Sequence, residues 1–234
     1  MSSPTTSSSN DLQKRRTLLL DLNLTPLEND LASLDYLTRK HDVFLSFRGE
    51  DTRTSFVSHL SASLQNAGII VFKDDQSLER GDRVSSTLLY AIGESRISVI
   101  VFSKNYADSS WCLQELLKIM ECHKTIGQVV LPVFYNVDPS EVRHQTGDFG
   151  KSFQKSLNRL SQEEESMVLR WGNNVLPGDG IRAVNQDTVL KWRDALCEAS
   201  GLAGCVVLNS RLLTSSLHLC SLFCAFKQFV YFLQ

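Results

Sequence analysis

The chain has 234 residues, of which 42% are hydrophobic and 21% are charged, and its formal net charge at pH 7 is −2. These values are ordinary for a soluble globular protein with one substantial domain and tails. Because the net charge is close to zero, we expect neither nucleic acid nor an anionic membrane as the main partner.

Residues 1–40 are predicted to be a disordered leader. The first ten residues are rich in Ser and Thr and have no apolar core, so we expect no secretory signal at the start of the chain. The six cysteines lack the paired spacing of metal ligands, and we therefore expect no metal. Without a secretory signal these cysteines are expected to be reduced thiols of a cytoplasmic protein.

From His41 onward, short apolar runs alternate with segments that have one apolar helical face. The apolar runs predict strands at residues 43–47, 69–72, 97–102 and 129–135. The segments with a helical face predict helices at residues 56–65, 84–92 and 111–123. Continuous β-branched runs separated by helices are typical of a parallel sheet that is covered on both faces, with right-handed crossovers.

The pattern is less regular after Tyr135. Asp138 and Pro139 are suited to the start of a helix, and further helices are predicted at residues 151–160 and 190–199. A fifth strand is predicted at residues 205–208, which would close a domain at 41–208. Residues 161–188 are charged and then rich in Gly and Asn, and they are predicted to be an insertion or loop. Residues 209–234 are predicted to form an apolar tail.

The most informative segment is HDVFLSFRGEDTRT, residues 41–54. A buried strand ends there in a cluster of charged residues around a glycine, and a helical pattern follows. The strand should therefore deliver Arg48, Gly49, Glu50 and Asp51 to the carboxyl end of the sheet. In open α/β sheets, ligands bind at that edge.

Four blocks of sequence resemble plant TIR (Toll/interleukin-1 receptor-like) domains. They are DVFLSFRGEDTR (42–53), FKDD with LERGD (72–75 and 78–82), FSKNYA leading into SWCLQEL (102–107 and 110–116), and PVFYNVDPS with VR and QTG (132–147). The resemblance extends from about His41 to Gly204 and implies an α/β fold, with a flavodoxin-like five-stranded parallel sheet of strand order 2-1-3-4-5. It also implies a cytoplasmic location, with the nucleus as a second one.

The chain departs from the family pattern in two respects. Ala203-Gly204-Cys205 stands where such domains usually have Ser-Gly-Trp, and there is no room for the nucleotide-binding and leucine-rich repeat regions of plant immune receptors. We therefore expect a TIR-only or truncated member of the family.

In a sheet of this order the loops that leave the first and third strands flank the ligand crevice. One loop covers residues 48–52, and the other covers residues 103–110 and leads into the helix that carries Trp111 and Glu115. Because these two residues are four apart, they share one face of that helix. The crevice is then lined by a cation, a glycine, an indole and one carboxylate.

One carboxylate is too few for ordinary glycoside hydrolysis, which needs an acid and a base or nucleophile. It can suffice for NAD, because nicotinamide leaves as a neutral molecule and only the oxocarbenium-like ribose needs stabilisation. The TIR resemblance implies that Glu115 is the catalytic residue of this cleavage. It also implies substrate contacts for six further residues: Arg48, Gly49, Arg53, Asp75, Ser109 and Trp111. The resemblance thus implies NAD as the substrate, and no cofactor is expected.

The resemblance further implies self-association, and association with other TIR proteins, through Ser58 and His59. Each assignment has a simpler alternative: Glu115 could be a solvated helix residue, Trp111 a core residue, Arg48 only a partner for Glu50 or Asp51, and His59 an exposed side chain. The sequence thus predicts a NAD glycohydrolase of plant immune signal transduction, giving nicotinamide and ADP-ribose or cyclic ADP-ribose. The alternative is a non-catalytic adaptor or decoy that acts by TIR–TIR association.

Overall fold

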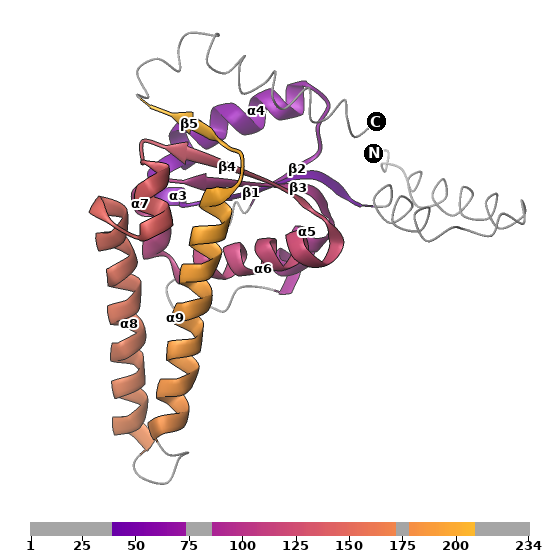
Figure 1. Cartoon of the computed structure of the whole chain (residues 1–234). Coiled ribbons are helices and arrows are strands. Elements are labelled where there is room, and N and C mark those ends of the chain that lie inside the picture. Colours follow the sequence, from indigo (N-terminus) through magenta and orange to yellow (C-terminus); the bar gives the residue numbers. More distant parts are fainter. Residues whose placement is uncertain (1–38, 74–85, 172–177, 209–234) are drawn as a thin grey trace, which may run out of the picture. The chain divides into compact units, whose positions relative to one another are not determined.

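The computed structural model describes residues 39–73, 86–171 and 178–208, with the side chains of residues 163–185 excepted (Figure 1). The helices and strands in these ranges are β1 (His41–Phe47), α3 (Gly49–Thr52), the π-helix η1 (Arg53–Val57), α4 (Ser58–Asn66), β2 (Val71–Lys73), α5 (Ser86–Gly93), β3 (Ser95–Phe102), the 3-10 helix η2 (Tyr106–Asp108), α6 (Ser110–Ile126), β4 (Val129–Tyr135), α7 (Pro139–His144), α8 (Gly147–Trp171), α9 (Gly178–Gly201) and β5 (Cys205–Val207). The predicted leader up to residue 38, the tail 209–234 and the substrate candidate Asp75 lie outside the described residues.

The strands form one parallel sheet in the order β2-β1-β3-β4-β5, as predicted for a flavodoxin-like fold. β1, β3 and β4 lie inside the sheet and are its most buried strands, because both of their faces are covered. Between β1 and β3 the chain reverses its direction of travel across the sheet. The ends of these two strands therefore mark the expected ligand edge.

Alternate side chains of the strands enter two separate cores. Phe44 and Phe102 pack on one face with residues of α5, α6, α8 and α9. Val43, Leu45 and Val99 pack on the other face with η1 and α4. Because side chains alternate along a strand, Ser46 of β1 points to the same face as Phe44, toward α6.

The helix that follows β3 has well-defined ends. Ser109 caps the first turn of α6, where its hydroxyl accepts a hydrogen bond from the backbone N–H of Cys112 at 3.3 Å. Gly127 ends the helix with φ 64°, a conformation that favours glycine. The predicted cap of α7 is also confirmed: the Asp138 carboxylate accepts from the Ser140 N–H at 2.7 Å, with Pro139 in the first turn.

Residues 161–188 are predicted to be an insertion or loop, and a loop is wrong for residues 161–171 and 178–188; residues 172–177 lie outside the described residues. Residues up to Trp171 continue α8, and residues from Gly178 belong to α9. The charged segment at 162–170 consists mainly of Gln, Glu, Met, Leu and Arg, which are good helix formers, so its polarity does not imply a loop. Within the described ranges, no helix combines the length and the apolar character needed to cross a bilayer.

Candidate active site

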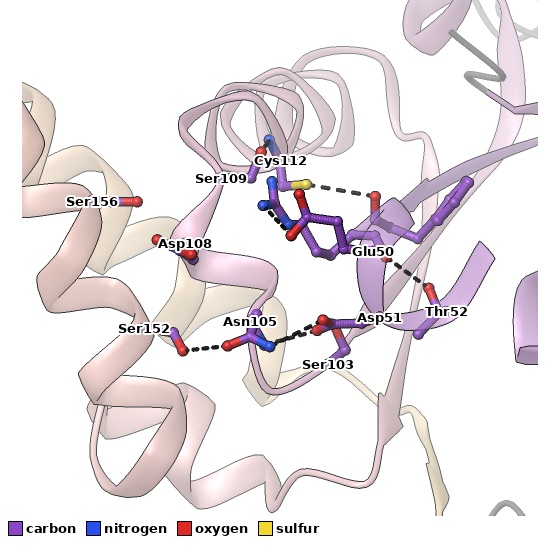
Figure 2. A network of polar contacts seen from close by, with 12 residues as sticks. Glu50, Asp51, Thr52, Ser103, Asn105, Asp108, Ser109, Cys112, Ser152 and Ser156 are labelled. Carbon is purple, nitrogen blue, oxygen red and sulfur yellow. Dashed lines mark hydrogen bonds and ion pairs between the residues drawn. The ribbon is translucent and has the colours of Figure 1, made fainter. Parts of the chain in front are cut away.

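The loops that leave β1 and β3 are joined by one carboxylate. Asp51 accepts hydrogen bonds from the Ser103 hydroxyl at 2.6 Å, the Asn105 backbone N–H at 2.9 Å and the Asn105 side-chain amide at 3.0 Å. Figure 2 shows Asp51 pointing at Ser103 and Asn105 across the gap between the two loops. The pair of loops expected to flank the crevice is therefore held together by three contacts to a single side chain.

Helix α8 holds the same β3 loop from its other side. The Ser152 hydroxyl donates to the Asn105 side-chain oxygen at 3.1 Å (Figure 2). The Ser156 hydroxyl donates to the Ala107 carbonyl at 2.7 Å. Arg159 donates to both the carbonyl and the carboxylate of Asp108. Because this loop runs directly into α6, these contacts fix the start of the helix that carries Trp111 and Glu115.

Removing the Asp51 carboxylate should loosen the β3 loop. In Asp51→Ala the three donors lose their acceptor, and we expect the free energy of unfolding to fall by about 2 kcal/mol. Amide hydrogen exchange of residues 103–109 should become faster, while Asp51→Asn, which keeps an acceptor oxygen, should show a smaller change. Glu50→Ala is the matched control, because Glu50 is the exposed neighbour of Asp51. Unchanged amide exchange at residues 103–109 in Asp51→Ala would show that the Asp51 carboxylate does not hold the β3 loop in place.

Glu115 is not a solvated helix residue. It is 7% exposed, and its Oε2 accepts a hydrogen bond from the Ser46 hydroxyl at 2.6 Å. Ser46 in turn lies 2.9 Å from the hydroxyl of Tyr106, which donates to the carbonyl of Cys112 at 3.0 Å. The carboxylate therefore sits at the end of a buried chain of hydroxyl groups that joins β1, η2 and α6.

Cys112 is the other reactive side chain beside Glu115. Burial, followed by the nearby charge of Glu115, raises the pKa of the Cys112 thiol to about 12. Its Sγ donates to the Phe47 carbonyl at 3.6 Å. A thiol with this pKa stays protonated near neutral pH and is a poor nucleophile. The carboxylate of Glu115 is therefore the better candidate for the chemistry.

This pKa gives a simple expectation for alkylation. At pH 8 iodoacetamide should modify the exposed Cys197 much faster than the buried Cys112, because Cys112 carries almost no thiolate. Peptide mass spectrometry of the native and the unfolded protein can measure both rates. Unfolding should equalise them, and equal rates in the native protein would mean that the Cys112 thiol is accessible and ionised.

The predicted substrate residues after β1 form a basic pair around a glycine. The Arg48 guanidinium contacts the carboxylate of Glu50 at 2.8 Å, so the simpler alternative for Arg48 does occur in this structure. Arg53 lies over the ring of Phe47 at 5.4 Å. A Cβ on Gly49 would lie 2.9 Å from the guanidinium of Arg53, so any larger residue at position 49 would displace that side chain.

The remaining predicted residues fall into two groups. Ser109 is buried as the cap of α6, and Trp111 in its first turn is half-buried. Ser58 and His59 are exposed on α4, which covers the opposite face of the sheet from α6. They therefore lie apart from the Glu115 cluster. Among the side chains that the structure describes, no group of His, Cys, Asp or Glu residues could hold a metal ion.

A family model for the TIR domain matches residues 40–187. The chain belongs to the TIR domain family.

Relatives of this TIR domain include plant disease resistance proteins. It is 48% identical over 174 residues to the disease resistance protein RPV1 of Vitis rotundifolia, a match that covers 74% of this chain and 11% of RPV1. It is 44% identical to the TMV resistance protein N of Nicotiana glutinosa, covering 70% of this chain and 12% of that protein. The TIR domains in the structure of the activated Roq1 resistosome, which recognises the pathogen effector XopQ, match with a TM-score of 0.54 and 45% identity, over 72% of this chain and 88% of that one. The chain thus spans only a small part of the length of these curated relatives.

Several residues of the TIR domain site could not be assigned a role from the sequence. Ser46 is a polar residue in an otherwise apolar strand, and its spacing of two from Phe44 is the one signal that it points toward a helix. Tyr106 and Asn105 lie in a short loop without periodicity, and Ser152 is one of several serines on α8. These residues become part of the site only through contacts between distant parts of the chain.

Proposed function

We propose that this TIR domain cleaves NAD between nicotinamide and ribose, with Glu115 as the catalytic group, and that the reaction serves plant immune signalling. The observation that carries the proposal is the buried carboxylate of Glu115, on the helix that begins at the β3 loop. The hydroxyl of Ser46 in β1 donates to this carboxylate at 2.6 Å. A charge removed from water and fixed in place stabilises a developing positive charge without reorganisation. The oxocarbenium-like ribose carries such a charge.

The reaction needs few other groups. The bond between C1′ of the ribose and the ring nitrogen of nicotinamide breaks, and its electron pair stays with nicotinamide, which leaves neutral. Water then attacks C1′ and releases a proton to give ADP-ribose; attack by a ring nitrogen of the adenine would give a cyclic product. In neither case does the leaving group need an acid.

The basic pair after β1 is suited to the two phosphates of NAD. Arg48 contacts Glu50, whose side chain is 75% exposed, and an exposed ion pair is worth little. A phosphate could therefore replace Glu50 as the partner of Arg48 at low cost, and a guanidinium binds phosphate well. Among the described residues, the buried Arg48 Nε has no hydrogen-bond partner and offers a further donor. Arg53, whose guanidinium lies close to Gly49, would supply the second cation.

The alternative function is that of an adaptor that binds other TIR domains without catalysis. The exposed Ser58 and His59 on α4 favour an interaction surface whatever the fate of the catalytic site. The two functions are compatible, since association of protomers can hold an open crevice in its active form. They are separated by asking whether NAD cleavage occurs and whether it requires association.

Cleavage should depend on protein concentration. We expect the nicotinamide released per protomer, measured by chromatography, to rise as the purified protein is concentrated. His59→Ala should flatten this rise by weakening association, whereas Glu121→Gln, exposed on α6 at the opposite face of the sheet, should not. Sedimentation measured in parallel should show association over the same range. Association of the wild-type protein without release of nicotinamide at any concentration would overturn the enzymatic function and leave the adaptor.

A further inference from the structure

The hydroxyl groups of Ser46 and Tyr106 are buried beside Glu115 for no evident packing reason. Both residues are 0% exposed, and Tyr106 lies in an apolar core where Phe would fill the same space. A hydroxyl in such a place is costly unless it is hydrogen-bonded. Within the described part of the chain, the two hydroxyls meet this condition through each other, the carboxylate of Glu115 and the carbonyl of Cys112.

The number of protons in this series of hydrogen-bonded groups is informative. Three contacts join the carboxylate, the two hydroxyls and the carbonyl, and each hydroxyl supplies one proton. When Glu115 is ionised, Ser46 donates to it, and the Tyr106 hydroxyl can turn its proton from the Cys112 carbonyl to Ser46. The Cys112 carbonyl stays hydrogen-bonded without Tyr106, because inside α6 it also accepts a hydrogen bond from the amide four residues later. When Glu115 is protonated, the chain can run in reverse, from Glu115 to Ser46, then to Tyr106 and to the carbonyl.

We propose that Ser46 and Tyr106 are positioning residues for Glu115, forming a two-hydroxyl relay that holds the carboxylate in place and stabilises its negative charge. This inference rests on the proposed NAD cleavage for its catalytic meaning. In the working state the chain runs from Tyr106 to Ser46 to Glu115, and each donor polarises the next. Neither hydroxyl needs to touch NAD.

The geometry supports such a role. The 2.6 Å contact from Ser46 to Glu115 has the length of a charge-assisted O–H···O⁻ bond. Ser46 belongs to an inner strand of the sheet and Tyr106 to a loop held by α8, so both donors are fixed before substrate arrives. Pre-organised donors of this kind keep a carboxylate in one orientation and hold it ionised.

Other titratable and charged groups lie near Glu115. They are Cys112 on α6, Tyr106 from η2, and Arg48 and Asp51 from the segment after β1, whose charges act on Cys112. Burial raises the pKa of Tyr106 well above its usual value, and the pKa of Cys112 is also raised. Both groups therefore stay neutral while a carboxylate titrates.

The relay can be tested without NAD. The side-chain carboxyl of Glu115 can be followed by carbon-13 NMR during a pH titration of the protein, with its resonance assigned from its absence in Glu115→Gln. We expect Ser46→Ala to raise the pKa of Glu115 by about one unit, since the ionised form loses one hydrogen-bond donor. Tyr106→Phe should raise it less, and Ser46→Thr, which keeps the hydroxyl, should restore the wild-type value. The control is Ser98→Ala, because Ser98 is an equally buried serine of β3 that donates instead to Gln128.

Kinetics give the second readout. The kcat for NAD in Ser46→Ala should fall about tenfold with KM little changed, as expected when one charge-assisted hydrogen bond is lost. The acid limb of its pH profile should move to higher pH. If Ser46→Ala shifts the pKa no more than Ser98→Ala does, the relay is overturned whether or not the protein cleaves NAD. A shift in the pKa of Glu115 in Ser46→Ala with unchanged kcat would overturn the positioning role. If Ser46→Ala shows the shift but the wild-type protein releases no nicotinamide, the relay is supported and only the proposed function is contradicted.

Discussion

Glu115→Gln is expected to lower the rate of NAD cleavage by at least ~100-fold, the effect of removing one pre-organised electrostatic group. Gln keeps the size and the hydrogen-bonding capacity of Glu, so it can still accept from Ser46. It lacks the negative charge that stabilises the oxocarbenium-like ribose. The measurement is the initial rate of nicotinamide release at equal protein concentration.

A matched control separates loss of chemistry from loss of fold. Glu121→Gln changes an exposed carboxylate on the same helix, where Glu121 contacts Lys118 at 3.1 Å, and it should keep the wild-type rate. Circular dichroism and the melting temperature should show both variants folded. Equal rates in folded Glu115→Gln and wild-type protein would rule out Glu115 as the catalytic residue.

The largest effect on stability is expected for Phe102→Ala, which should lower the free energy of unfolding by about 3–5 kcal/mol. Phe102 is fully buried at the end of β3, and its ring contacts those of Tyr106, Phe134 and Phe149 at centroid distances of 5.0, 5.6 and 6.3 Å. Its removal would leave a cavity where β3, η2, β4 and α8 meet. Urea denaturation followed by fluorescence or circular dichroism measures the change.

The control for this prediction is Tyr90→Ala. Tyr90 is a large aromatic residue that is 71% exposed on α5, so its removal should change the free energy of unfolding by at most about 0.5 kcal/mol. Phe102→Leu should lie between the two variants, because Leu fills part of the cavity. A loss in Phe102→Ala no larger than that in Tyr90→Ala would show that this aromatic cluster contributes little.

The inner strands could be predicted from sequence because both of their faces are buried. The apolar run 129–135 coincides with β4. The edge strand is less well defined by its sequence, since the prediction began at Ile69 and β2 begins at Val71. The Ile69 N–H still donates to the Leu64 carbonyl near the end of α4. The Ile70 carbonyl already accepts from the backbone of β1, but its N–H donates to the Asp42 carboxylate, so Ile70 is only half paired and the regular ladder begins at Val71.

The candidate site was predicted only in part. The TIR resemblance pointed to Glu115, and the structure shows that this residue is buried and hydrogen-bonded. Its donor Ser46 is 69 positions away along the chain, and no local pattern reveals a contact of that range. The contacts of Asp51 with Ser103 and Asn105 depend in the same way on strand order and on the exact ends of the strands, which sequence patterns define least well.

The most direct test of the central claim is a time course of NAD and nicotinamide with concentrated wild-type and Glu115→Gln protein side by side. We predict that the wild-type protein releases one nicotinamide for each NAD lost, together with ADP-ribose or its cyclic form, and that Glu115→Gln releases almost none. Stable NAD in the presence of folded, associated wild-type protein, or equal release by both proteins, would contradict the claim that the carboxylate of Glu115 cleaves NAD.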